Sequence, residues 1–216
     1  MNIEHARFNM IEQQIRPTNV SSPEVLELLS IVKREDFFPA AQKSLAFFDT
    51  SLPLVAGIVS LTPKLEARIV QDVAAKKTDS VLVIDADSGY LAAMLAYQAR
   101  HVTVMEAVPE VRELAQNNMT KNGVRNVDVQ WGDAMQAGSF AAFDVIVVTG
   151  SLESVPQSLQ DQLNVGGRLF VVVGSEPVMT AQLITRESEL FFNTQKLFET
   201  SIPRLSQVAP ASTFSL

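Results

Sequence analysis

The chain lacks cysteine and has only two histidines, His5 and His101, in 216 residues. The absence of cysteine excludes disulfides, thiolate metal sites and a cysteine nucleophile, and two histidines leave little for a zinc site or a catalytic triad. Basic residues are also scarce, since 17 lysines and arginines stand against 24 acidic residues and the formal net charge is -7. No basic stripe could neutralise successive phosphates, so nucleic acid is not an expected partner.

Long hydrophobic runs are missing too. No run approaches the roughly eighteen apolar residues that span a bilayer, and residues 1–17 have mixed charge without the apolar centre of a signal peptide. We therefore expect a cytoplasmic protein with no membrane partner. An apolar content of 47% and a charged content of 19% are typical of a globular chain, and the length favours one domain over 1–216.

From residue 80 onward, short apolar runs alternate with amphipathic stretches. The runs are continuous in Val, Ile and Leu, which is typical of strands that helices cover on both faces. This order predicts an α/β fold with a mostly parallel central sheet. The last two runs, 179–187 and 195–202, lie close enough in sequence to form an antiparallel hairpin at the sheet edge. Residues 80–216 are thus predicted to form a Rossmann-like core.

Residues 1–79 show a different pattern. Helices are predicted at 2–14, 23–33 and 64–76, with a proline-punctuated loop before the third. We interpret this part as an N-terminal helical cap over the sheet. In the core, further helices are predicted at 108–119 and 155–163.

The first strand-to-helix turn of an open α/β sheet is the usual ligand position, and here it includes Asp85, Asp87 and Gly89. A dinucleotide site needs several glycines at this turn, and two aspartates would repel phosphates, so NAD and FAD are not expected. A cationic or less anionic ligand fits better. The alternative for both aspartates is capping of the following helix.

Two acids follow the next strands. Glu106 ends the second strand, where a carboxylate can accept hydrogen bonds from both hydroxyls of a ribose. The alternative is a solvent-exposed glutamate at a strand end. Asp133 follows the third strand, where it could meet an adenine amino group, although Gly132-Asp133 is also an ordinary turn dipeptide.

Several motifs in order resemble one known family. They are MIEQQIRP (10–17), REDFFP (34–39), LAFFDTSLPL (45–54), SGYLAAMLA (88–96), NGVRNVDVQWGD (122–133), FDVIVVTGSLESVP (143–156) and QLNVGGRLFVVVG (162–174). With these segments nearly the whole chain resembles the protein-L-isoaspartate O-methyltransferases, which are repair enzymes with the class I methyltransferase fold. The resemblance implies an S-adenosylmethionine cofactor and a peptide or protein substrate that carries isoaspartate.

By this resemblance, the 85–89 loop holds the methionine end of the cofactor. Glu106 binds the ribose, and Asp133 with Ala134 lies at the adenine end. The family pattern at the loop is Glu-Ile-Gly-Thr-Gly-Ser-Gly, whereas this chain has Val83 for the acid and Asp85 and Asp87 for two glycines.

The substrate loop also departs from the family, whose Gly-Gln-Thr-Ile-Ser-Gln-Pro corresponds to the 57–63 loop here. Val59 and Leu61 stand at the family's two hydroxyl positions. Ser60 and Thr62, one position away, are therefore the candidate catalytic hydroxyls. The alternative is that the loop's apolar side chains plug the former pocket.

These departures leave two main hypotheses. The first is an S-adenosylmethionine-dependent methyltransferase of the isoaspartyl-repair type, and the second is a catalytically silent relative that retains the fold as an interaction module. A nucleotide-dependent oxidoreductase is a third hypothesis, because a sheet of this kind does not choose its ligand. The oligomeric state is not predicted.

Overall fold

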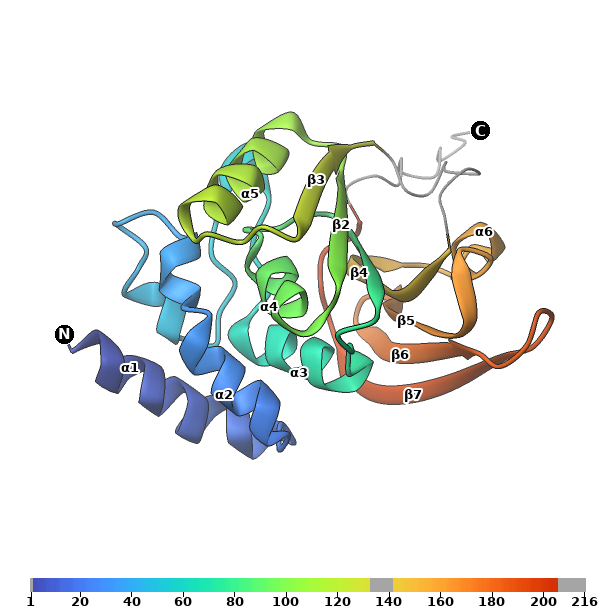
Figure 1. The fold of residues 1–216 in the computed structure, drawn as a ribbon. Coiled ribbons are helices and arrows are strands. Elements are labelled where there is room, and N and C mark those ends of the chain that lie inside the picture. The colour runs from blue at the N-terminus through green and yellow to red at the C-terminus, as the bar shows by residue number, and fades with distance from the viewer. Residues whose placement is uncertain (1, 133–141, 206–216) are drawn as a thin grey trace, which may run out of the picture.

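The computed structural model describes residues 2–132 and 142–205 (Figure 1). Its centre is a seven-stranded sheet in the order β3-β2-β1-β4-β5-β6-β7. The strands are β1 Ser80–Ile84, β2 His101–Glu106, β3 Val127–Trp131, β4 Phe143–Leu152, β5 Leu163–Ser175, β6 Val178–Arg186 and β7 Phe192–Thr200. The neighbours from β3 to β5 are parallel, while β6 pairs antiparallel with both β5 and β7. The predicted mostly parallel sheet and its C-terminal hairpin are confirmed.

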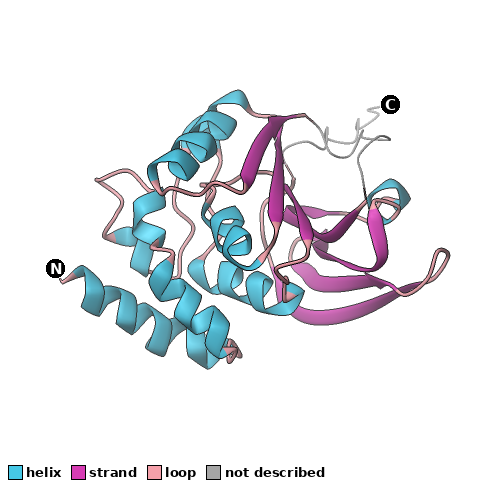
Figure 2. Ribbon diagram, viewed as in Figure 1, coloured by secondary structure: helices cyan, strands magenta, loops and turns pink. Residues whose placement is uncertain are grey.

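Helices cover both faces of this sheet, as the continuous apolar strands predicted (Figure 2). In β1, Val81 and Val83 join the larger core cluster, together with apolar residues of α3 (Pro63–Val73), α4 (Tyr90–Gln98) and α5 (Pro109–Lys121). Leu82 and Ile84 point to the opposite face and join a second cluster with Leu159 of α6 (Gln157–Gln160). Alternate residues of one strand thus enter two different cores.

The three helices predicted in residues 1–79 are present, and the third of them is α3. The first two are α1 (Ile3–Asn9), with a π-helical continuation (Met10–Ile15), and α2 (Pro23–Ile31). These helices lie outside α3 and α4, which separate them from the sheet (Figure 1). Three short 3₁₀ turns, Arg34–Phe37, Leu45–Phe47 and Val55–Gly57, lead from α2 to α3. One domain over 1–216 stays a prediction.

Two predictions about helices need correction. The helix expected over 155–163 is confined to Gln157–Gln160, because Leu163 already begins β5. The 90–99 stretch, one of the amphipathic stretches expected between the strands, forms α4 and is not amphipathic, since every residue from Tyr90 to Ala96 is buried. It lies between the sheet and the outer helices, so no side of its first two turns meets water.

Candidate functional site

A cavity of about 190 Å³ opens at the carboxyl ends of β1, β2 and β4, where ligands of open α/β sheets bind. Its walls are the 57–63 loop, the 85–89 loop, the end of β2, two residues of β4 and the segment after β7. The polar and charged side chains that line it are Ser51, Ser60, Thr62, Asp85, Asp87, Glu106, Thr149, Thr200, Ser201 and Arg204. This volume is below the range of about 300 to 1,000 Å³ that is usual for ligand pockets.

The 85–89 loop adopts a backbone conformation that favours glycine. Asp85 has a φ of 66° and Asp87 a φ of 51°, and Gly89 has a φ of 88°. Aspartate tolerates this left-handed region better than most residues, although less well than glycine. The turn therefore carries carboxylate side chains at two positions where glycine would leave the backbone bare.

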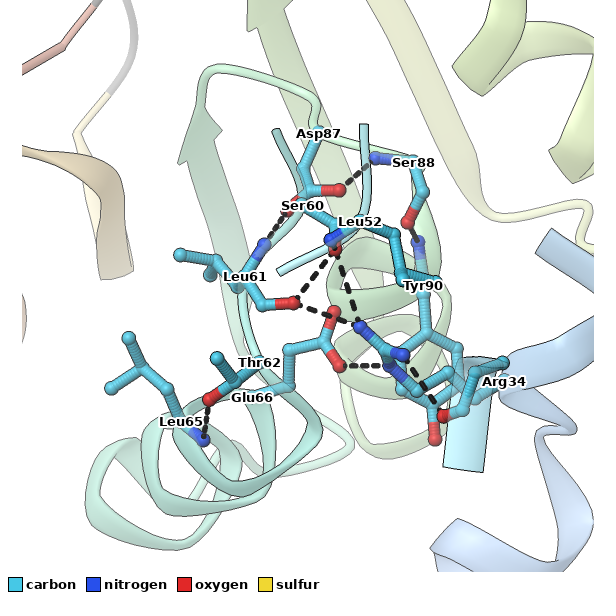
Figure 3. A network of polar contacts seen from close by, with 11 residues as sticks. Arg34, Leu52, Ser60, Leu61, Thr62, Leu65, Glu66, Asp87, Ser88 and Tyr90 are labelled. Carbon is cyan, nitrogen blue, oxygen red and sulfur yellow. Dashed lines mark hydrogen bonds and ion pairs between the residues drawn. The ribbon is translucent and has the colours of Figure 1, made fainter. Parts of the chain in front are cut away.

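Asp87 turns its carboxylate into the molecule and connects the two loops (Figure 3). Its Oδ2 accepts a hydrogen bond of 2.6 Å from the Leu61 N–H, and its Oδ1 accepts another from the Ser88 N–H. Burial raises the pKa of this carboxyl, and the two backbone hydrogen bonds oppose that effect. Asp87 does not cap the following helix, α4. The first N–H of that helix belongs to Tyr90 and donates to the Ser88 hydroxyl at 3.4 Å, so the capping alternative is wrong for Asp87.

Glu106 fastens the same loop from the other side. Its Oε2 accepts a hydrogen bond from the Ala86 N–H and its Oε1 one from the Val108 N–H, both 2.7 Å long. The residue is only 1% exposed, so the alternative of a solvent-exposed glutamate is wrong. Burial raises its pKa, against the lowering effect of the hydrogen bonds. A carboxylate has about four lone-pair sites, and backbone N–H groups of Ala86, Ala107 and Val108 act on this one, so the group can still accept from a ribose hydroxyl.

The two candidate catalytic hydroxyls already have local partners. Ser60 is 1% exposed, and its Oγ accepts from the Leu52 N–H at 3.0 Å and lies 2.9 Å from the Leu61 carbonyl oxygen. The Thr62 Oγ1 accepts from the Leu65 N–H at 3.4 Å and caps α3. Both residues line the cavity, and their catalytic role stays a prediction.

The apolar residues of the 57–63 loop divide in their placement. Leu61 is 5% exposed and Ile58 packs, partly buried, against the larger core cluster, whereas Val59 is 40% exposed, so Val59 does not fit the predicted plug of Ile58, Val59 and Leu61. Asp133 and Ala134, the candidates for the adenine end, lie outside the described residues.

Beneath the loop lies a buried contact between the guanidinium of Arg34 and the carboxyl of Glu66, which the sequence did not single out (Figure 3). Arg34 donates from Nε to Glu66 at 2.7 Å and from Nη2 to the Leu61 carbonyl oxygen at 2.8 Å. Burial raises the pKa of Glu66 to about 8, against the attraction of Arg34, and the nearby Asp87 raises it further. One cation therefore faces two buried carboxylates. Glu66 is an acidic residue among the apolar positions of the helix predicted at 64–76, and this was the signal in the sequence that could have indicated its burial.

The segment after β7 closes the cavity and was also missed. Pro203 accepts from the Ser151 N–H at 2.8 Å, and the Leu205 N–H donates to the Ser151 carbonyl oxygen at 3.1 Å. A Cβ on Gly150 would stand 2.4 Å from the Leu205 Cα, so the close approach requires glycine. The segment adds Arg204 to the wall, and its guanidinium donates to the Ser175 Oγ at 2.9 Å.

Two classes of site are not found in the part of the chain that the structure describes. No group of three or more metal-ligating side chains gathers in residues 2–132 and 142–205. Over the same residues, no helix is long and apolar enough to cross a membrane. The cavity at the strand ends is therefore the candidate that its position supports best.

The chain is similar to known proteins over most of its length. Residues 5–203 match the family model of protein-L-isoaspartate(D-aspartate) O-methyltransferase. A protein-L-isoaspartate O-methyltransferase of Rhodopseudomonas palustris is 36% identical over 182 residues, which cover 84% of this chain and 83% of that protein. One from Gloeobacter violaceus is 37% identical over 168 residues, or 77% of this chain and 82% of its own.

A solved structure is similar over almost the whole chain. It is a protein-L-isoaspartate O-methyltransferase from Plasmodium falciparum in complex with S-adenosyl-L-homocysteine. The TM-score is 0.80 at 17% sequence identity, with 96% of this chain and 100% of that chain covered. At this identity the likeness bears on the fold, and it agrees with the class I methyltransferase architecture.

Proposed function

We propose, from the premise that this chain belongs to the protein-L-isoaspartate(D-aspartate) O-methyltransferase family, that it transfers a methyl group from S-adenosylmethionine to the carboxylate of an isoaspartyl residue in a peptide or protein. The observation that carries the proposal is the shared wall of the cavity. Residues of the 57–63 loop and of the 85–89 loop line the same space, so a donor and an acceptor held by the two loops would lie side by side.

The side chains of the cavity fit such a cofactor in charge. Asp85, Asp87 and Glu106 are acidic and suit a ligand that carries a sulfonium and an amino group, and Glu106 has lone pairs left for ribose hydroxyls. In size the fit requires a movement, because about 190 Å³ is less than a ligand of this kind needs. The Asp87 side chain, which connects the two loops, is the group that has to move.

When bound, S-adenosylmethionine supplies an electrophilic methyl group on a positively charged sulfur. The acceptor carboxylate is ionised at neutral pH, so the chain needs no strong base. What its residues contribute is alignment and the exclusion of water. The buried Leu61 and the segment that contains Arg204 would exclude water, and the 57–63 loop would orient the acceptor.

Two assays test the proposal. Calorimetric titration with S-adenosylmethionine and S-adenosylhomocysteine is expected to give saturable heat. A labelled-methyl assay is expected to show incorporation into an isoaspartyl peptide and none into the aspartyl peptide of the same sequence. Absence of heat with either ligand at millimolar concentration would show that the chain does not bind the cofactor and would contradict the proposal.

The second candidate is a silent member of the family that acts as an interaction module. The closed contact between Asp87 and Leu61 favours it, since this contact and the small cavity oppose ligand entry. The double replacement of Asp85 and Asp87 by glycine separates the two candidates. Cofactor binding that appears only in the double variant would support the silent member, whereas measurable affinity in the parent would exclude it.

A further inference from the structure

The carboxylate of Asp87 lies in a buried position whose surrounding groups suit an anion. It is 6% exposed, and it accepts hydrogen bonds from the backbone N–H groups of Leu61 and Ser88. The positive charge of Arg34 acts on it, and Arg34 also holds the Leu61 carbonyl at 2.8 Å. The backbone on both sides of the Leu61 Cα is thus fixed, with its N–H directed at a carboxylate.

This contact is more than a local turn. Leu61 and Asp87 are 26 residues apart in sequence, and their hydrogen bond joins the 57–63 loop to the 85–89 loop across the cavity wall. A turn alone would need only glycine at position 87, where φ is 51°. Aspartate adds the desolvation of a buried charge, and the gain that offsets it is the contact with the other loop.

We infer that the Leu61 N–H is the binding position for the carboxylate of the acceptor, and that Asp87 occupies it as an internal ligand. The inference rests on the proposed function for the identity of the acceptor and defines how that site is controlled. An isoaspartyl carboxylate enters by displacing the Asp87 carboxylate, which has the same chemistry. Displacement also frees the 85–89 loop from the 57–63 loop, so the cavity enlarges when the acceptor binds.

The competition is uneven in the resting chain. A carboxylate that its own backbone holds in position acts at an effective concentration far above that of a free anion at tens of millimolar. A small free carboxylate with a weak affinity for one backbone position therefore gains little occupancy while Asp87 is present. Removal of the Asp87 side chain leaves the two N–H groups without their acceptor and opens the position to an external anion.

The test uses ¹⁵N-labelled protein and sodium acetate as the probe, with no cofactor present. In Asp87→Gly, acetate at tens of millimolar is expected to shift the Leu61 and Ser88 amide signals in a saturable way, and sodium chloride is not. The parent chain is expected to show no such shift. The matched control is Asp85→Gly, which alters the neighbouring positive-φ aspartate and leaves Asp87 in place, so it should behave like the parent.

Each outcome decides the inference. A folded Asp87→Gly variant whose Leu61 amide ignores acetate would overturn it, as would an equal response in the parent. If Asp87→Gly does not fold, Asp87→Asn keeps an acceptor oxygen without the charge, and acetate should then shift the Leu61 amide signal at concentrations at which the parent does not respond. An unchanged Asn variant would also contradict the proposal.

The same variants separate this inference from the proposed function. The affinity for an isoaspartyl peptide is expected to rise at least tenfold in Asp87→Gly, whether or not methyl transfer occurs. Binding of acetate and peptide without heat from S-adenosylhomocysteine would retain the carboxylate position and refute the methyltransferase. Heat from S-adenosylhomocysteine without any gain in peptide affinity would retain the cofactor site and refute the carboxylate position at Leu61.

Discussion

Replacement of Glu66 by glutamine tests whether Glu66 is protonated in the folded chain, where Arg34 is the cation near both Glu66 and Asp87. Arg34 contacts one oxygen of Glu66 at 2.7 Å, while the other oxygen, Oε1, has no hydrogen-bond partner among the described residues. Glu66 is fully buried, and the carboxylate of Asp87 acts on it as a like charge. For these reasons its pKa is raised from 4.5 to about 8, so in the folded chain the carboxyl holds a proton at neutral pH.

The direction of the pH effect follows from this shift. Between pH 4.5 and about 8 the folded chain keeps a proton that the unfolded chain has lost. The free energy of unfolding therefore falls by about 1.4 kcal/mol for each pH unit in this window, and the stabilisation is complete only below pH 4.5. The whole window corresponds to about 5 kcal/mol. Glutamine has a similar shape and does not titrate, so Glu66→Gln removes this dependence.

Urea denaturation of the parent and of Glu66→Gln at several values from pH 5.5 to 8.5 measures the effect. The difference between the two free energies of unfolding is expected to move by roughly 3 kcal/mol in favour of glutamine as the pH rises from 5.5 to 8.5. Glu27→Gln, which changes an exposed acid in α2, is the control and should give a constant difference. A constant difference for Glu66→Gln would mean that Glu66 is ionised throughout and would refute the argument.

Two other substitutions test the walls of the cavity. Gly150→Ala places a Cβ 2.4 Å from the Leu205 Cα and is expected to lower the free energy of unfolding by about 1 to 3 kcal/mol, so a loss under 0.5 kcal/mol in denaturation would contradict the close approach. Glu106→Ala removes the acceptor of two backbone N–H groups and is expected to cost about 2 to 4 kcal/mol and to weaken binding of S-adenosylhomocysteine. Glu106→Gln retains one oxygen and should fall between the two, and equal stability of all three proteins would show that Glu106 does not hold the loop.

The fold could be predicted from the sequence because its signals are local. Continuous apolar runs such as 80–84 indicated strands buried on both faces, and the two late runs indicated the hairpin that β6 and β7 form. Boundaries were weaker, as α6 shows, because Leu163 satisfies a strand as well as a helix. The burial of α4 depends on the outer helices that cover it, and the residues of α4 alone do not indicate it.

The site could be predicted only in part. The positions of Asp87 and Glu106 followed from the strand ends, since parallel strands bring their carboxyl ends to one edge. Their hydrogen bonds did not, because the partner of Asp87 is Leu61 in another loop. The pair of Arg34 and Glu66 depends on a contact between residues 32 positions apart, which no periodicity shows. Ser60 was considered for its hydroxyl, and the structure shows that this hydroxyl contacts backbone groups.

The contact between Asp87 and Leu61, and the ligand that displaces it, decide how this cavity works. A crystal structure of the unmodified chain, grown with S-adenosylhomocysteine and an isoaspartyl peptide, tests this most directly. We expect the nucleoside to lie beside Glu106, the peptide carboxylate to accept from the Leu61 N–H, and the Asp87 carboxylate to be turned away from it. Crystals soaked to saturation that contain neither ligand and keep the Asp87 to Leu61 hydrogen bond at 2.6 Å would contradict this expectation.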